Sequence, residues 1–421
     1  MVLNMVRFEI KKIFGSFGGK IALLLYIGFL LLACQSAVKD SSGRGIYAIN
    51  NQGQEITGTE AVKMIRSSIN EWEGVLDEEK ISDVIQELHR IYNSPEYNSD
   101  VVAERDMAYG WQEGVRPIRN MLIDAYNDSL DVYERDDYYI PESLSPSAAN
   151  SFYSNRMKLL TQYLETGNGK DKFTDSEKEW LINHYEDWET PIYYDYTLGW
   201  QQLLSYVMFI SAYGALIIGF LVTGIFTKEF RWKADAVYFT TVLGRNKATA
   251  AKIKAGFITV TGLYWGAVLI FTLFTLFYFG FDGAGCAIQL IENYWECPYN
   301  WTCGEAYLLT VICGYIGNLF IAFLTMYVSA KTKSSTFPVT ISFLAIFIGW
   351  ILEMTGIEAL EKVTLLPDRL LTAFHYLNKF EVCSLGFTAV GSLPLAVIIY
   401  GILTALLVPT MYQEFRKKRV Y

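Results

Sequence analysis

The sequence predicts an all-α membrane protein with six transmembrane helices and a large, mainly helical extracytoplasmic domain inserted between the first and second of them. Three observations support this fold class. The composition is 52% hydrophobic and 15% aromatic, which is rich for a soluble protein. Six uncharged runs are close to the roughly 20 residues with which a helix crosses a bilayer. A long acidic stretch separates the first run from the other five.

The six uncharged runs are the expected transmembrane helices. Each contains apolar and small polar residues without Asp, Glu, Lys or Arg, and the fifth run is the shortest. The runs are Ile21–Val38, Leu203–Phe226, Phe257–Gly280, Tyr307–Val328, Thr336–Leu352 and Leu393–Tyr412.

The first 20 residues are expected to form an amphipathic helix on the inner membrane surface. Val6, Ile10 and Ile13 recur at helical spacing, with Arg7 and Lys12 among the basic residues around them. The alternative is the basic start of a signal peptide, because the sequence from Leu31 to Cys34 resembles a lipoprotein cleavage box. We favour the helix and leave open whether Cys34 is lipidated.

Basic residues predict the orientation, because Lys and Arg in short flanking segments resist translocation. The segments 1–20, 227–256, 329–335 and 413–421 carry 4, 7, 2 and 4 of them. The short segments on the other side carry only Lys362, Arg369 and Lys379. We therefore expect a multi-pass protein of the plasma membrane with both termini cytoplasmic and 413–421 as a basic tail.

The long segment between the first two runs, residues 39–202, is expected outside the cell. From Lys39 to Asp195 it holds 31 acidic and 15 basic residues, whereas the rest of the chain holds 13 acidic and 20 basic. Thr57 with Glu60, and Thr174 with Glu177, have the spacing of a capping box at a helix start. Apolar residues at helical spacing follow Thr57 and recur from Ile81 to Leu88, so a mainly helical domain is predicted.

Aromatic residues crowd the segment just before the second run. Tyr and Trp favour the headgroup zone of a bilayer, where an apolar ring and a polar tip are both satisfied. We interpret the group as an anchor at the outer interface, with a substrate-contacting patch as the alternative. Its members are Trp188, Tyr193, Tyr194, Tyr196 and Trp200.

Four of the six cysteines fall outside the predicted helices on the extracytoplasmic side: Cys286, Cys297, Cys303 and Cys383. A disulfide among them is chemically allowed in that compartment, and its pairing is left open. The three histidines lie far apart without a His or Cys at ligand spacing, so no metal site is expected.

The sequence carries no familiar motif of hydrolytic catalysis, metal binding or phosphate binding. The stretch from Gly167 to Lys170 is not a phosphate loop, since Asp171 stands where Ser or Thr is required. No hydrolase elbow and no His-Glu-x-x-His motif occurs. We expect a protein that is not an enzyme, has no catalytic residue, binds no cofactor of its own and has no nucleic-acid partner.

The most informative segment is the predicted cytoplasmic loop 227–256, within the membrane part 203–412. It mixes aromatic and charged residues, is too polar to span a membrane, and suits a short helix that docks into a partner's groove. The alternative is a plain inner loop whose charges only set topology.

The loop resembles the corresponding segment of type-two ABC exporter permeases in three features. These are a Glu soon after the second run, a Thr-Thr-x-x-Gly-Arg stretch and a Lys before the third run. The resemblance implies that this loop holds the coupling helix that contacts an ATPase subunit. The residues carried over are Glu229, Thr240, Thr241, Gly244 and Arg245. It further implies a separate ATPase partner that holds ATP-Mg, a second permease in a homo- or heterodimer, and short helices after the fifth run that dip into the outer leaflet. The 160-residue insert departs from many members and leaves the substrate in doubt.

Asn318 is the one intramembrane polar residue singled out. An unpaired amide in lipid is costly, so Asn318 should face protein or a cavity. We favour helix–helix packing over substrate contact. Gly214, Gly219, Gly314 and Gly317 could allow the close approach of helices.

Two functions are compatible with these features. The first is a permease subunit that exports an amphipathic or hydrophobic substrate, such as a peptide, lipid or drug, within the surrounding membrane lipid. The alternative is a membrane-anchored sensor or assembly scaffold whose outer domain binds a ligand.

Overall fold

The computed structural model describes residues 2–39, 45–50, 52–130, 139–241, 243–332, 334, 336–355 and 363–417. Within them the chain is mostly helical, and six helices are long and apolar enough to cross a membrane. Lys362 and residues 418–421 of the predicted basic tail lie outside the described residues. The number of transmembrane helices expected from the sequence is therefore confirmed.

Each membrane helix extends beyond its uncharged run at one end or both, because a helix does not have to end where the hydrocarbon ends. Thus α10 continues past Phe226 to Arg231 and carries Lys228 and Glu229 in its last turns. The six helices are α2 (Phe17–Ala37), α10 (Leu198–Arg231), α12 (Thr249–Phe279), α13 (Cys303–Thr332), α14 (Thr336–Glu353) and α18 (Ser392–Arg416).

The N-terminal helix α1 is shorter than predicted and spans Val2–Gly15 rather than residues 1–20. Ser16 interrupts the helix, and its hydroxyl accepts a hydrogen bond from the Gly19 amide at 3.2 Å, which caps the start of α2. Val6 and Ile13 of the predicted apolar face are buried. Residues 17–20 therefore belong to the first membrane helix.

The helices α10 and α13 form the buried centre of the bundle. Asn318 of α13 is fully buried, and its amide donates to the carbonyl oxygens of Ser211 at 2.9 Å and Gly314 at 2.8 Å. A Cβ at Gly314 would overlap the hydroxyls of Ser211 and Tyr264, so the helices approach closely only because this residue is glycine. These contacts place Asn318 and Gly314 where α13 packs against α10.

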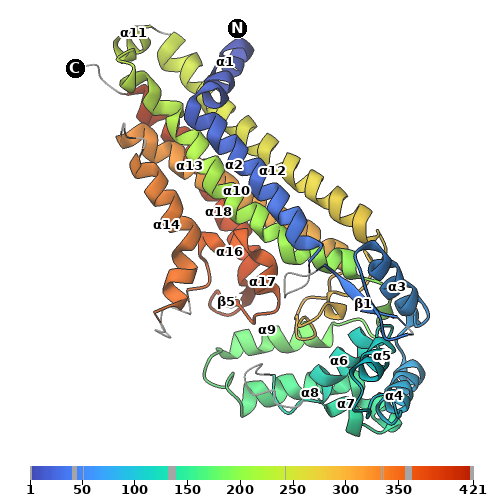
Figure 1. The fold of residues 1–421 in the computed structure, drawn as a ribbon. Coiled ribbons are helices and arrows are strands. Elements are labelled where there is room, and N and C mark those ends of the chain that lie inside the picture. The colour runs from blue at the N-terminus through green and yellow to red at the C-terminus, as the bar shows by residue number, and fades with distance from the viewer. Residues whose placement is uncertain are drawn as a thin grey trace.

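The insert between α2 and α10 forms a lobe at the end of the bundle opposite α1 and α11 (Asp235–Thr240), as Figure 1 shows. It is mainly helical, as predicted, with two small antiparallel pairings, β1–β2 and β3–β4. Its elements are β1 (Tyr47–Ile49), β2 (Glu55–Thr57), α3 (Thr59–Asn70), β3 (Gly74–Val75), α4 (Glu78–Tyr92), α5 (Val102–Gly110), α6 (Arg116–Tyr126), α7 (Ile140–Ser143), the 3-10 helix Pro146–Ser151, α8 (Phe152–Glu165), α9 (Asp175–Glu186) and β4 (Tyr193–Tyr194).

Only one of the two predicted capping boxes forms. Thr174 and Glu177 cap α9 reciprocally, as the spacing indicated. Thr57 instead ends strand β2, where it pairs with Tyr47, and α3 starts from Gly58, whose φ of 70° is accessible mainly to glycine. The strand pairing takes up the residue that the helix would have used as its cap.

Three of the five aromatic residues before α10 lie in the protein core rather than at a membrane interface. Trp188, Tyr194 and Tyr196 are buried in the main core, while Tyr193 is half exposed. The Tyr194 hydroxyl donates to the Gly114 carbonyl at 2.7 Å. The anchor interpretation is therefore wrong for the three buried rings, which join the lobe to the end of the bundle.

The lobe is completed by later segments of the chain. Arg156 of α8 is buried and donates to the carbonyl oxygens of Trp295 at 2.9 Å and Cys297 at 2.6 Å. Its guanidinium also lies over the rings of Tyr185 and Trp188. The remaining elements are the 3-10 helix Ile288–Leu290, α16 (Pro367–Leu371), α17 (Ala373–Leu377), β5 (Val382–Ser384) and β6 (Ala389–Gly391).

All six cysteines are free thiols in the structure, so it does not contain the disulfide that the sequence allows. Cys286, Cys297 and Cys303 are buried in or beside the loop between α12 and α13. Burial raises the pKa of the Cys286 and Cys297 thiols to about 12. They therefore stay protonated and are weak nucleophiles.

Candidate coupling site

The connection between α10 and α12 is more helical than the predicted loop 227–256. Residues 227–231 belong to α10, the short helix α11 spans Asp235–Thr240, and a π-helix, Gly244–Ala248, leads into α12. The predicted loop is therefore wrong at both ends, because the helices carry their charged residues beyond the apolar runs. The predicted short helix inside the segment is present.

The Thr-Thr-x-x-Gly-Arg residues shape the turn after α11. The Thr241 hydroxyl accepts a hydrogen bond from the Gly244 amide at 3.0 Å, and the Arg245 Nε donates to the Phe239 carbonyl at 2.6 Å. A Cβ at Gly244 would collide with the Tyr238 carbonyl oxygen, so only glycine fits there. These residues hold α11 in place against the start of α12.

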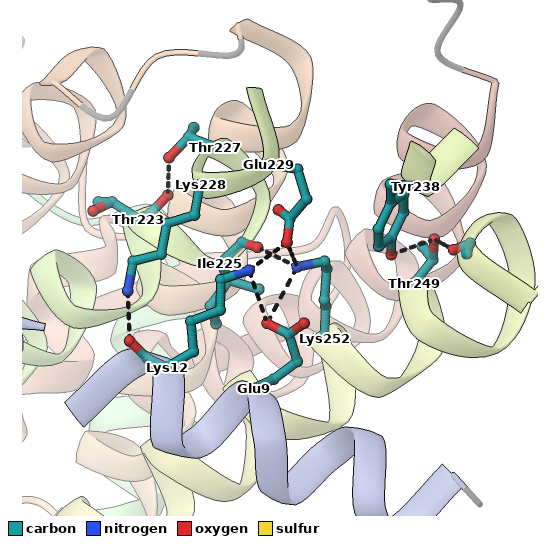
Figure 2. A network of polar contacts seen from close by, with 11 residues as sticks. Glu9, Lys12, Thr223, Ile225, Thr227, Lys228, Glu229, Tyr238, Thr249 and Lys252 are labelled. Carbon is teal, nitrogen blue, oxygen red and sulfur yellow. Dashed lines mark hydrogen bonds and ion pairs between the residues drawn. The ribbon is translucent and has the colours of Figure 1, made fainter. Parts of the chain in front are cut away.

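Glu229 does not lie on the surface but in a buried ion cluster, shown in Figure 2. Its Oε1 accepts hydrogen bonds from the Nζ of Lys252 at 2.7 Å and from the Nζ of Lys12. Glu9 of α1 completes the cluster, with its Oε2 3.2 Å from the Nζ of Lys252. Two carboxylates and two ammonium groups thus join α1, α10 and α12.

The Lys252 ammonium is satisfied despite complete burial. Its three N–H groups face Glu9, Glu229 and, at 2.8 Å, the carbonyl oxygen of Ile225. Burying a charge costs several kcal/mol unless it is paired and hydrogen-bonded, as it is here. The cluster therefore fixes the relative positions of three helices at this end of the bundle.

One oxygen of the cluster remains without a partner. Glu229 Oε2 accepts no hydrogen bond from the described residues. The Glu229 residue also lines a cavity of about 440 Å³ between α1 and the α11 segment, together with Phe8 and Tyr238.

An aromatic cluster fixes α11 to its neighbours. The Phe239 ring of α11 lies 5.9 Å from that of Phe230 and 5.2 Å from that of Phe415, centroid to centroid. Phe226 of α10 contacts Phe415 at 4.6 Å, and Tyr238 contacts it at 5.7 Å. A displacement of α11 would therefore move the ends of α10 and α18 as well.

Beyond these contacts the connection exposes apolar side chains among basic ones such as Lys233 and Lys247. Val237 is 72% exposed and Trp232 60% exposed, and Leu243 is also exposed. Thr240 and Thr241 lie on the exposed part of the same segment. Of the five residues carried over from the resemblance, the structure thus places two threonines at the surface, Arg245 partly buried and Glu229 and Gly244 inside.

Sequence reasoning missed the partners of Glu229. Glu9 is the single acid among the first 20 residues, and Lys252 follows Thr249 into the apolar part of α12. A charged residue in such apolar surroundings indicates that it has a partner of opposite charge. The sequence did not reveal that this partner involves Glu229, because the paired residues lie 23 or more positions apart along the chain.

Comparisons with models of protein families, with curated proteins and with solved structures give no match.

Proposed function

We propose that this protein is the permease subunit of an ATP-binding cassette exporter, with α11 as its coupling helix. The observation that carries the proposal is the attachment of α11. Its outer side exposes Val237, while its inner side contacts α10 and α18 through Phe239. The end of α10 is joined in turn to α12 through the Glu229–Lys252 pair. A partner that pulls on α11 therefore moves the bundle.

The partner would be a separate ATPase subunit that binds ATP-Mg, since this chain supplies the membrane path and no nucleotide site is assigned to it. A second permease, identical or related, would complete the path. The free energy that drives transport would come from the different affinities of the ATPase for nucleotide in its open and closed states.

The proposed orientation puts the coupling end in the cytoplasm of the cell and the lobe outside the plasma membrane. In support, α1, α11 and the C-terminal end of α18 lie together, so the most basic segments share one end (Figure 1). Such segments stay on the cytoplasmic side during insertion.

The proposed cargo is amphipathic or hydrophobic: a peptide, a lipid or a drug. A cavity of about 510 Å³ at the junction of lobe and bundle is lined by apolar residues such as Met121 and by charges of both signs, among them Glu292 and the Glu113–Arg116 ion pair. A lining of apolar and charged groups suits an amphipathic molecule.

The test is a pull-down of the tagged chain from its own host membranes. Val237→Glu should abolish co-purification of an ATPase with a Walker motif, because it puts a charge into an apolar docking surface. The matched control is Val102→Glu, at an exposed site on α5 of the lobe. Retention of the ATPase by Val237→Glu, or its loss in both variants, would remove the assignment. Glu229 is unsuitable for this test, since its replacement would disrupt the buried cluster.

The sensor or scaffold remains the second candidate because the lobe has a cavity of its own. It measures about 700 Å³ and is lined by Trp72, Trp111, Asn50 and Glu71. The same pull-down separates the candidates, since a signalling kinase in place of the ATPase would favour the sensor.

A further inference from the structure

A groove of about 930 Å³ opens at the basic end of the bundle and shares no lining residue with the Glu229 cavity. It lies between the junction of α1 and α2, the last turns of α10 and the first turns of α14. Nothing in the coupling proposal requires this groove. Its lining has two zones, an apolar depth and a basic rim.

The apolar depth is formed by Phe220 and Leu221 of α10 and by Val339 and Phe343 of α14. Phe220 and Phe343 are close to half exposed. From Phe220 to Arg231 the helix rises roughly 16 Å, at about 1.5 Å per residue. This is about half of the roughly 30 Å hydrocarbon core, the depth of one leaflet.

The rim carries positive charge without compensation. Among the described residues that line the groove, only Lys228 and Arg231 are charged, and none is acidic. The Lys228 Nζ donates to the Lys12 carbonyl oxygen at 2.6 Å and so points away from Glu229, as Figure 2 shows. Arg231 is exposed and makes no hydrogen bond or ion pair with a described residue.

The ion cluster does not neutralise this rim. Glu9 and Glu229 are already matched by Lys12 and Lys252, so the two cations of the groove remain in excess. Trp232 also lies at the rim, under the Lys12 ammonium at 5.0 Å, in the position of an interfacial aromatic.

We propose that this groove binds one anionic phospholipid of the leaflet at the basic end of the bundle. The phosphate lies at Lys228 and Arg231, and an acyl chain extends along Phe220 and Phe343. The pairing of two cations with an apolar channel one leaflet deep favours a lipid over a soluble phosphate, which would use the rim alone. The site requires only that the bundle lies in a bilayer and does not depend on the ATPase.

Native mass spectrometry of the purified full chain tests the proposal, with phosphatidylglycerol and phosphatidylcholine of identical acyl chains competing for it. Each basic residue near an anionic headgroup contributes about fivefold in affinity. Arg231→Gln should therefore reduce the preference for phosphatidylglycerol about fivefold, and Lys228→Met should reduce it by a similar factor. Arg231 is exposed, so its variant should fold normally even if Lys228→Met does not.

The matched control is Lys254→Gln, which removes an exposed cation at the same end of the bundle but outside the groove. It should keep the full preference. Equal preference in wild type and Arg231→Gln would overturn the proposal. Full displacement of the lipid by soluble glycerol phosphate would overturn it as well, because it would show an anion site alone. Loss of the lipid whenever the chain dimerises would identify a second copy as the occupant and would also overturn it.

Discussion

Lys252 donates a hydrogen bond to Glu229 across 2.7 Å at a point where the lysine is completely buried and the glutamate nearly so. The contact joins α12 to α10 just inside the helix ends that lead to α11. An exposed pair of this kind would contribute little to stability. A buried one leaves a charge without compensation when either partner is removed.

Replacement of Lys252 should therefore destabilise the protein strongly. We expect Lys252→Met to lower the free energy of unfolding by about 3–5 kcal/mol, because Glu9 and Glu229 would share the single cation Lys12. Chemical denaturation in detergent measures the change. Lys254→Met, two residues further on and exposed, is the control and should change stability by less than about 0.5 kcal/mol.

The double variant Lys252→Met with Glu229→Gln extends this test. Removing the opposite charge should recover part of the loss, so that the two changes are not additive. Additive losses would show that the two side chains do not interact, contrary to the contact described here.

The close approach of α10, α12 and α13 predicts a second effect. Gly314→Ala should lower thermal stability, since the new methyl group would overlap the hydroxyls of Ser211 and Tyr264. Gly401→Ala in α18 is the matched control, because a Cβ there meets nothing within 4 Å. Its variant should be neutral or stabilising, as alanine favours a helix by about 1 kcal/mol over glycine. The idea fails if both substitutions have the same effect.

Titration of Asp368 should make the stability of the protein depend on pH. Burial raises the pKa of its carboxyl to about 6, although the neighbouring Arg369 acts in the opposite direction. The folded state therefore binds this proton more tightly than the unfolded state does. The contribution of Asp368 to the free energy of unfolding is therefore greatest below about pH 4. It decreases by on the order of 2–3 kcal/mol as the pH rises through 6.

Asp368→Asn should remove this dependence and stabilise the protein at pH 7 to 8. Unfolding measured from pH 4 to 8 checks the sign. Asp171→Asn, on the exposed surface of the lobe, should leave the curve unchanged. A wild type that becomes more stable between pH 4 and 6, with the gain lost in Asp368→Asn, would contradict the prediction.

Much of the fold could be predicted because membrane helices need long apolar runs, which a single sequence displays. The ends of the helices and strands were harder to predict from the sequence. Thr57 and Thr174 precede Glu at the same spacing, yet strand pairing with Tyr47 withdraws Thr57 from its helix.

The candidate site was predicted only in part. Gly244 and Thr241 were singled out only through the resemblance to exporter permeases, and the structure places them together in the turn after α11. Glu229 was expected to contact a partner protein, but it is buried in an ion pair with Lys12, which lies 217 residues away in the sequence. The hydrophobic periodicity of a sequence does not indicate contacts between residues so far apart. Trp188 and Tyr196 were misplaced for the same reason, since Tyr-rich composition does not distinguish a membrane interface from a core.

Photo-crosslinking in intact membranes tests the central claim that α11 docks on an ATPase. A photoreactive amino acid at Val237, compared with one at Val102 in the lobe, is activated in the living host, and the crosslinked protein is identified by mass spectrometry. We predict a crosslink from position 237 to a chain with a Walker motif, and none to that chain from position 102. Crosslinking of the ATPase from position 102 alone, or of no ATPase from position 237, would contradict the account.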